Sequence, residues 1–133
     1  MRTGHLWVVL CALVVLIGAM RPEQTMTVTA SAYNSTRAQT DDNPNEGAWG
    51  DEITPGMQVV AVSPDLVEAG LDRENELQIE GLPGTWTVLD RTAPRHRRRI
   101  DIYMGTDVEA AVKWGQKKVT IRWSTPTSPS DRP

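Results

Sequence analysis

Cysteine, histidine and aromatic residues are scarce in this chain of 133 residues. It holds one cysteine, two histidines, two tyrosines and no phenylalanine. The single thiol, Cys11, excludes an internal disulfide framework and a cysteine-based zinc site, because each needs several thiols. The histidines, His5 and His96, are too few to complete a zinc site without cysteine. We therefore expect no metal and no cofactor.

Charge of one sign is not in large excess over the whole chain, but the two halves of the predicted domain carry opposite net charge. The formal net charge is −3, which argues against nucleic-acid binding, because that binding needs many cations against the phosphates. Residues 26–80 hold two basic and eleven acidic side chains, whereas residues 81–123 hold nine basic and four acidic ones. The chain length predicts a single domain and, we expect, a monomer.

Long hydrophobic runs are absent, with one exception near the amino terminus. Leu6–Met20 has fifteen residues without a charge and follows the basic residue Arg2. As a helix it would reach about 22 Å, short of the ~30 Å hydrocarbon core of a bilayer. The pattern is typical of a secretory signal with a poor cleavage site, and a buried core helix is the alternative. We expect residues 1–25 to be a signal peptide or signal anchor of an exported, cell-envelope protein, with membrane contact through this segment only.

Period-two alternation and valine-rich runs predict six strands. Their ranges are 26–33, 57–62, 76–80, 86–89, 99–103 and 118–123. A capping box predicts a short helix with Thr106 as its N-cap and Glu109 as the partner, ending at Gly115. Residues 63–69 are expected to form at most a second, single-turn helix. Turn residues separate all these elements.

These elements predict a mainly β fold, a small six-stranded barrel with one or two short helices, preceded by an N-terminal hydrophobic helix. A closed barrel is favoured because closure removes exposed strand edges. We expect the barrel domain over residues 26–123 and a long polar loop over residues 39–54. Residues 124–133 contain three prolines and no large apolar side chain, which predicts a disordered tail.

Two aspartates are the strongest candidates for acid–base chemistry. Asp101 lies in the alternating segment Arg99–Tyr103, whose Ile100 and Ile102 are expected to face the core. Asp90 ends another predicted strand. If the two strands are neighbours, opposed Cβ atoms lie about 4.5–5.5 Å apart, and one pKa of the pair rises, as a general acid needs. The alternatives are a surface aspartate paired with arginine and a turn cap.

A basic run and a tryptophan are the remaining binding candidates. The run covers Arg95–Arg99, with Arg91 upstream, and predicts either a solvated loop or contact with an anionic polymer. Trp49 lies in the predicted polar loop and could stack on a sugar ring, whereas Trp114 and Trp123 are expected in the core. No motif of a serine nucleophile supports catalysis by a serine–histidine–aspartate triad.

Several segments together resemble the three-aspartate (3D) domain. They are TVTASAYNS at 27–35, VAVSPDL at 60–66, VLDR at 88–91, RIDIYMGT at 99–106 and AAVKWG at 110–115. This domain forms the catalytic barrel of membrane-bound lytic transglycosylase A and occurs in small secreted resuscitation-type bacterial proteins. The resemblance implies a double-psi β-barrel that cleaves the MurNAc–GlcNAc bond of peptidoglycan.

The resemblance also assigns roles to individual residues. Asp101 corresponds to the acid that then acts as base and yields a 1,6-anhydro product, and Asp90 corresponds to a second aspartate of the family. The remaining aspartate position is Ser63 here, so either Asp65, Asp41 or Asp42 substitutes for it or the set of three aspartates is incomplete. The residues expected to bind substrate are Tyr33, Asp65, Trp49, Tyr103 and Arg91.

The sequence therefore predicts a lytic transglycosylase whose partner is the peptidoglycan glycan strand. The alternative is a non-catalytic glycan-binding barrel that keeps the groove without the acid. A third hypothesis is an anchored adaptor for an envelope protein, and it rests only on the leader and the tail.

Overall fold

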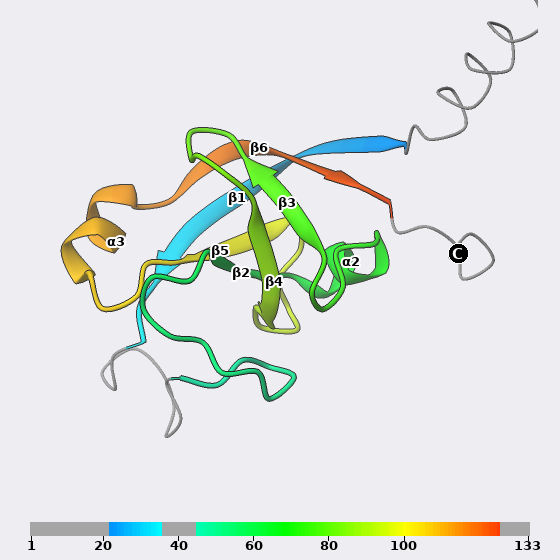
Figure 1. Cartoon of the computed structure of the whole chain (residues 1–133). Helices are drawn as coiled ribbons and strands as arrows, with labels where there is room; N and C mark the ends of the chain where they lie inside the picture. Colours follow the sequence, from blue (N-terminus) through cyan, green and yellow to red (C-terminus); the bar gives the residue numbers. More distant parts are fainter. Residues whose placement is uncertain (1–21, 36–44, 126–133) are drawn as a thin grey trace, which may run out of the picture.

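Six strands and two short helices form in residues 22–35 and 45–125, which are the residues that the computed structural model describes. The strands close into a barrel in the order β1-β5-β2-β4-β3-β6 (Figure 1). The strand bounds are Glu23–Tyr33 (β1), Val59–Val62 (β2), Glu76–Ile79 (β3), Trp86–Arg91 (β4), Arg99–Tyr103 (β5) and Lys117–Ser124 (β6). The predicted six-stranded barrel is confirmed, with β1 beginning three residues earlier than expected.

The predicted ends of the chain fall mostly outside this description. The leader up to residue 21 and the tail from residue 126 onward are not among the described residues. Within the described ranges, no helix is long and apolar enough to cross a membrane.

The barrel contains both parallel and antiparallel strand pairs. Strand β1 pairs parallel with β5, and β2 pairs parallel with β4. The other four pairings, β1–β6, β2–β5, β3–β4 and β3–β6, are antiparallel. Neither parallel pair joins strands that are consecutive in the chain, as the predicted double-psi connectivity requires.

The barrel interior is filled by the apolar side chains of the alternating strands. Val60 and Val62 of β2 and the predicted core pair Ile100 and Ile102 of β5 are fully buried. Trp123 also lies in the core, as expected. Trp114 is only partly buried and packs against the core. Burial on one face of each strand leaves the opposite, outer face to carry the polar residues.

A second, smaller apolar cluster covers part of this outer face. It consists of Ile53, Val59, Leu89 and Tyr103, with Tyr33 packed against it. Its members come from β1, β2, β4, β5 and the loop before β2.

Two short helices follow strands β2 and β5 in the chain. Helix α2, Pro64–Glu68, buries Leu66 and confirms the expected single turn. Helix α3, Val108–Trp114, begins one residue later than predicted. Its N-cap is Asp107, whose side chain accepts a hydrogen bond from the N–H of Ala110 at 2.9 Å, so the assignment of Thr106 as N-cap is wrong. Aspartate is as good an N-cap as threonine, and the sequence places them side by side.

Candidate functional site

The two candidate aspartates lie on the outer face on either side of one small residue. Ala61 of β2 pairs with Asp101 of β5 on one side and with Asp90 of β4 on the other. Strands β4 and β5 are therefore not neighbours, and the condition for a closely opposed carboxylate pair is not met. Two strand spacings put the backbones of the aspartates about 10 Å apart. The two carboxylates are therefore separate, and only the small side chain of Ala61 lies between them.

A β-bulge in β4 sets the position of Asp90. Val60 pairs with Val88, but the next residue of β2, Ala61, pairs with Asp90, so Leu89 is the extra residue. A bulge bends the strand and re-aims the side chains that follow it. Here it allows Leu89 to enter the outer apolar cluster while Asp90 lies level with Asp101.

Asp90 is held by three hydrogen-bond donors. The backbone N–H groups of Ala48 and Arg91 donate to its Oδ1 at 3.0 and 2.9 Å, and the Tyr33 hydroxyl donates to its Oδ2 at 3.3 Å. Burial raises the pKa of Asp90 above its ordinary value, and the charge of Asp101 adds to this effect. The three donors oppose the rise without cancelling it.

Tyr33 links the two sides of the site. It pairs with Tyr103 across the β1–β5 ladder, and the two ring centroids are 5.4 Å apart. Burial first, and then the charge of Asp90, raise the pKa of the Tyr33 phenol well above its ordinary value. Tyr33 therefore remains a hydrogen-bond donor to Asp90 at any physiological pH.

Asp101 is positioned through a serine on the neighbouring strand. Ser31 pairs with Asp101 in the β1–β5 register, and its hydroxyl donates to Asp101 Oδ1. Nη2 of Arg99 in turn donates to Ser31 Oγ at 2.9 Å. Sequence reasoning missed Ser31, although the alternation of β1 already placed it on the polar face with Tyr33.

Ser63 and Asp65 organise the turn before β5 rather than joining the aspartates. The buried Ser63 hydroxyl accepts from the N–H of Arg99 at 3.1 Å, and Asp65 Oδ2 accepts from the N–H of Arg98 at 2.9 Å. Arg98 has a positive φ of 45°, so this contact supports a strained turn. Partial burial favours a higher pKa for Asp65, but hydrogen bonds from Ser63 and Arg98 outweigh it and lower that pKa. The other expected substitutes, Asp41 and Asp42, lie outside the described residues.

The remaining expected binding residues take supporting positions. The Arg91 guanidinium lies 4.9 Å from the centroid of the Trp49 ring, so it covers one face of the indole. Tyr103 is buried, and its hydroxyl donates to Ser35 Oγ at 2.9 Å. Tyr103 thus forms part of the floor beneath the site.

The loop before β2 brings Ala48 and Trp49 to the site. Part of the predicted polar loop, from residue 45 on, folds back on itself through a bridge between Glu46 and Glu52. A Cβ atom on Gly47 would lie 2.0 Å from the Leu89 carbonyl oxygen, so only glycine permits this approach. The close approach presents the Ala48 N–H to Asp90.

A hollow of about 590 Å³ lies along β2 and β4, beside the outer apolar cluster. Val59 and Leu89 of the outer apolar cluster line it, together with the acidic side chains of Asp51, Glu52 and Glu74. Asp51 is held by Arg73 at 2.6 Å, which ties the loop to the barrel. The hollow extends the candidate site on the side away from Arg99.

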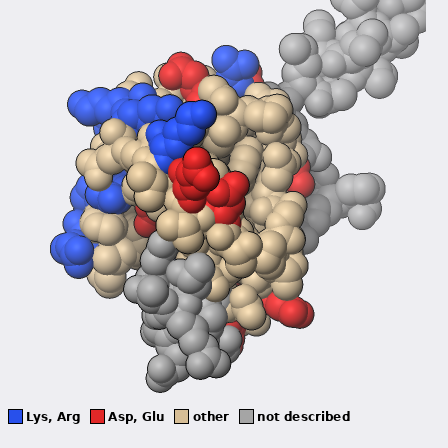
Figure 2. All heavy atoms as spheres, turned by 90° about the vertical axis from the view of Figure 1, so that its left-hand side faces the viewer, with Lys and Arg blue, Asp and Glu red and all other residues tan. Residues whose placement is uncertain are grey.

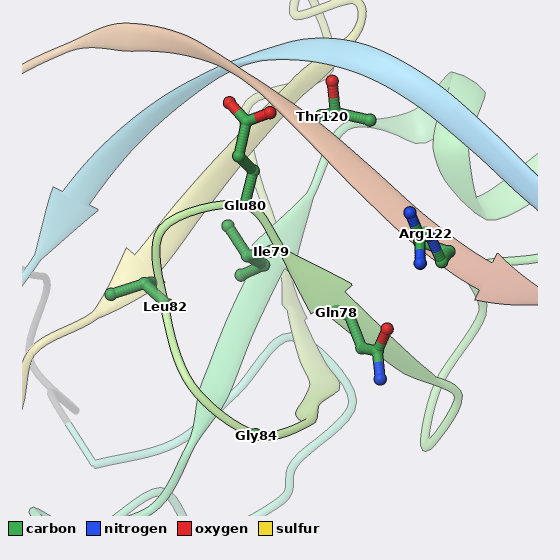
Figure 3. A pocket seen from close by; sticks show the side chains of 7 residues that line it. All are labelled: Gln78, Ile79, Glu80, Leu82, Gly84, Thr120 and Arg122. Carbon is green, nitrogen blue, oxygen red and sulfur yellow. The ribbon is translucent and has the colours of Figure 1, made fainter.

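Another hollow, of about 360 Å³, lies against β3 and β6 on the opposite wall of the barrel (Figure 3). Its polar side chains are Gln78, Glu80, Thr120 and Arg122. It has one carboxylate and no aromatic side chain among its lining residues, so it lacks the paired arrangement of the outer-face site. Within the described ranges, no group of three or more His, Cys, Asp or Glu side chains could hold a metal ion.

Comparison of the sequence with protein-family models and with curated proteins gives no match. The structure is similar to that of an expansin from Clavibacter michiganensis in its apo form, with a TM-score of 0.51 and 20% identity. A point mutant of the expansin from the same organism, in complex with cellohexaose, gives a TM-score of 0.46 and 20% identity. In both comparisons 80% of this chain and 54% of the expansin chain are covered. The chain thus spans about half the length of these structures, and the likeness to the apo form shows a shared fold.

Proposed function

We propose that this barrel binds cell-wall glycan strands across the outer face of β1, β5, β2 and β4. The observation that carries the proposal is the placement of Asp90 and Asp101 on either side of Ala61. Two fixed carboxylates over a flat floor can accept hydrogen bonds from the hydroxyl groups of adjacent sugars, and charged acceptors form strong hydrogen bonds. The adjoining hollow gives a polymer room to continue.

The partner that we propose is peptidoglycan, reached outside the cytoplasm. The predicted leader at residues 1–25 supports export, and the resemblance to the three-aspartate domain supports peptidoglycan as the glycan. The likeness to an expansin fold is compatible with this assignment. We propose that the protein acts as a monomer.

Cleavage of the glycan as a lytic transglycosylase is the second candidate function. It is favoured by the two carboxylates held on either side of Ala61, and the resemblance to the three-aspartate domain assigns the proton transfer to Asp101. In the reaction, Asp101 donates its proton to the glycosidic oxygen as the bond from C1 to that oxygen breaks. The muramoyl 6-hydroxyl then attacks C1 and returns its proton to Asp101. The product is a 1,6-anhydro sugar, and no water is consumed.

In this mechanism the two aspartates have different roles. Asp101 receives a hydrogen bond from Ser31, and the resemblance assigns the proton transfer to it. Asp90 lies across Ala61, and its protonation changes the local charge that Asp101 meets. The expected role of Asp90 is therefore to position sugar and set the electrostatics, as the resemblance implies.

Incubation with purified peptidoglycan sacculi tests both functions in one experiment. The wild-type protein, Asp101→Asn and Asp90→Asn are assayed for binding by sedimentation and for released products by mass spectrometry. Binding without release supports the glycan-binding module. Anhydro-muropeptides that disappear in Asp101→Asn support the transglycosylase, and hydrolysed reducing ends would change the reaction but keep the site. Absence of binding and of release by the wild-type protein would contradict the proposed function.

A further inference from the structure

A second polar row crosses the outer face two residues beyond the aspartates. The N–H of Thr92 donates to the carbonyl of Val62 at 3.0 Å, and the N–H of Ser63 donates to the carbonyl of Arg99 at 3.0 Å. Thr92 and Arg99 therefore flank Ser63 as Asp90 and Asp101 flank Ala61. Since side chains of a strand return to the same face every second residue, this row faces the same side as the aspartates.

The row presents hydrogen-bond donors that no described protein group uses. Arg99 Nε and Thr92 Oγ1 are both buried and have no hydrogen-bond partner among the described residues. Arg99 Nη2 is tied to Ser31, which fixes the guanidinium beside Asp101. Buried polar atoms are rarely left without a partner, so these donors point to a ligand with acceptor oxygens.

The charge around this row favours an anion. Arg95, Arg97 and Arg98 lie in the turn that precedes Arg99 and are exposed. None of the arginines of this run has an acidic partner within 4.0 Å in the described part of the chain, where the ion pairs involve Arg73 and Arg122. Figure 2 shows another face, the one that carries α3, where basic side chains also gather toward one side and acidic ones are scattered. Unpaired positive charge of this kind attracts anionic ligands.

We propose that Arg99 and Thr92 bind a carboxylate group carried by the glycan, next to the sugars held by Asp90 and Asp101. The planar guanidinium matches carboxylate geometry better than an ammonium group does. This inference rests on the proposed function and makes it more specific, because it selects carboxylated glycans over neutral ones. In peptidoglycan, muramic acid supplies such a lactyl carboxylate where the stem peptide has been removed, because elsewhere this carboxyl is amide-linked to the peptide.

Two tetrasaccharides with the same backbone test this inference by calorimetry. One alternates GlcNAc with MurNAc and carries free lactyl carboxylates, and the other is chitotetraose, which has none. The wild-type protein is expected to bind the carboxylated ligand about tenfold more tightly, as for a hydrogen-bonded charged group. Arg99→Gln should abolish this preference, Arg99→Lys should restore part of it, and Thr92→Val should reduce it. Arg122→Gln, on the opposite wall, is the matched control and should leave it unchanged.

The outcomes separate this inference from the proposed function. Equal affinity of the wild-type protein for both ligands would overturn the carboxylate site while keeping glycan binding. An equal loss for both ligands in Arg99→Gln would show that Arg99 only supports Asp101, and would also overturn it. Binding of neither ligand would overturn the proposed function itself. Competition with inorganic phosphate and acetate identifies the anion, and displacement by phosphate alone would overturn the carboxylate assignment.

Discussion

Asp90 and Asp101 share one neighbour, Ala61, and lie level with each other on strands that do not touch. Strand β2 between them contributes only a methyl group at this point. The aspartates therefore interact through their charges rather than by direct contact.

Replacing Asp90 with asparagine should change how stability depends on pH. Burial raises the pKa of Asp90 in the folded state, so its contribution to stability is fully present below its unfolded pKa of about 3.9 and is lost as pH rises through the folded value. The free energy of unfolding of Asp90→Asn, relative to wild type, should therefore increase as pH rises from about 4 to 7. Urea unfolding across this range measures the difference. A difference that does not vary with pH would refute the burial argument.

Ser31 and Asp101 should be energetically coupled. Because the Ser31 hydroxyl donates to Asp101, the effects of Ser31→Ala and Asp101→Asn on unfolding should fail to add by about 0.5–3 kcal/mol. A double-mutant cycle by chemical unfolding measures this coupling. Thr27→Ala, farther along the same strand, is the control and should add with Asp101→Asn. If Ser31→Ala also adds, the hydrogen bond contributes nothing.

Gly47→Ala should detach the loop from Asp90. Its Cβ would meet the Leu89 carbonyl at 2.0 Å, and such overpacking costs about 1–3 kcal/mol. Loss of the Ala48 donor should raise the pKa of Asp90 further, which carboxyl NMR titration can follow. Gly81→Ala, at a positive φ of 87° with open space around it, should strain the backbone without affecting Asp90. An unchanged Asp90 titration in Gly47→Ala would contradict the assigned role of the loop.

Asp65→Ala should destabilise the protein at neutral pH and not in acid. The pKa of Asp65 is lowered by its hydrogen bonds despite the opposing effect of burial, so its contribution is present above its unfolded pKa of about 3.9 and is lost as pH falls. A cost of about 1 kcal/mol is expected at pH 7. Glu68→Ala, exposed in the same helix, should cost less than about 0.5 kcal/mol. A cost for Asp65→Ala that does not decrease as pH falls below about 4 would argue against this role.

The barrel itself could be predicted because its signals are local. Alternation gave the β5 bounds and the burial of Ile100 and Ile102, and proline and glycine marked the turns around β2. The N-cap of α3 was misplaced by one residue because Thr106 and Asp107 can both cap a helix. A local sequence pattern does not distinguish two such neighbours, and only the backbone geometry shows which residue is the N-cap.

The arrangement of the site depends on strand order, which local patterns do not contain. Asp90 and Asp101 were chosen from the sequence, but the insertion of β2 between their strands follows from the crossed connections. Ser31 and Thr92 could not be predicted as site residues from local patterns. Ser31 depends on Asp101, which is 70 residues away in the chain, and Thr92 depends on its position beside β2. Likewise, the bulge at Leu89 has no sequence signal of its own.

NMR titration with the alternating GlcNAc–MurNAc tetrasaccharide tests whether the glycan lies across the outer face. Glycan bound there should change the amide shifts of Ser31, Ala61, Arg91 and Asp101, and should leave those of Gln78 and Thr120 in the opposite hollow unchanged. Shift changes confined to the wall of β3 and β6 would contradict the account and would place the glycan in the hollow of Figure 3 instead.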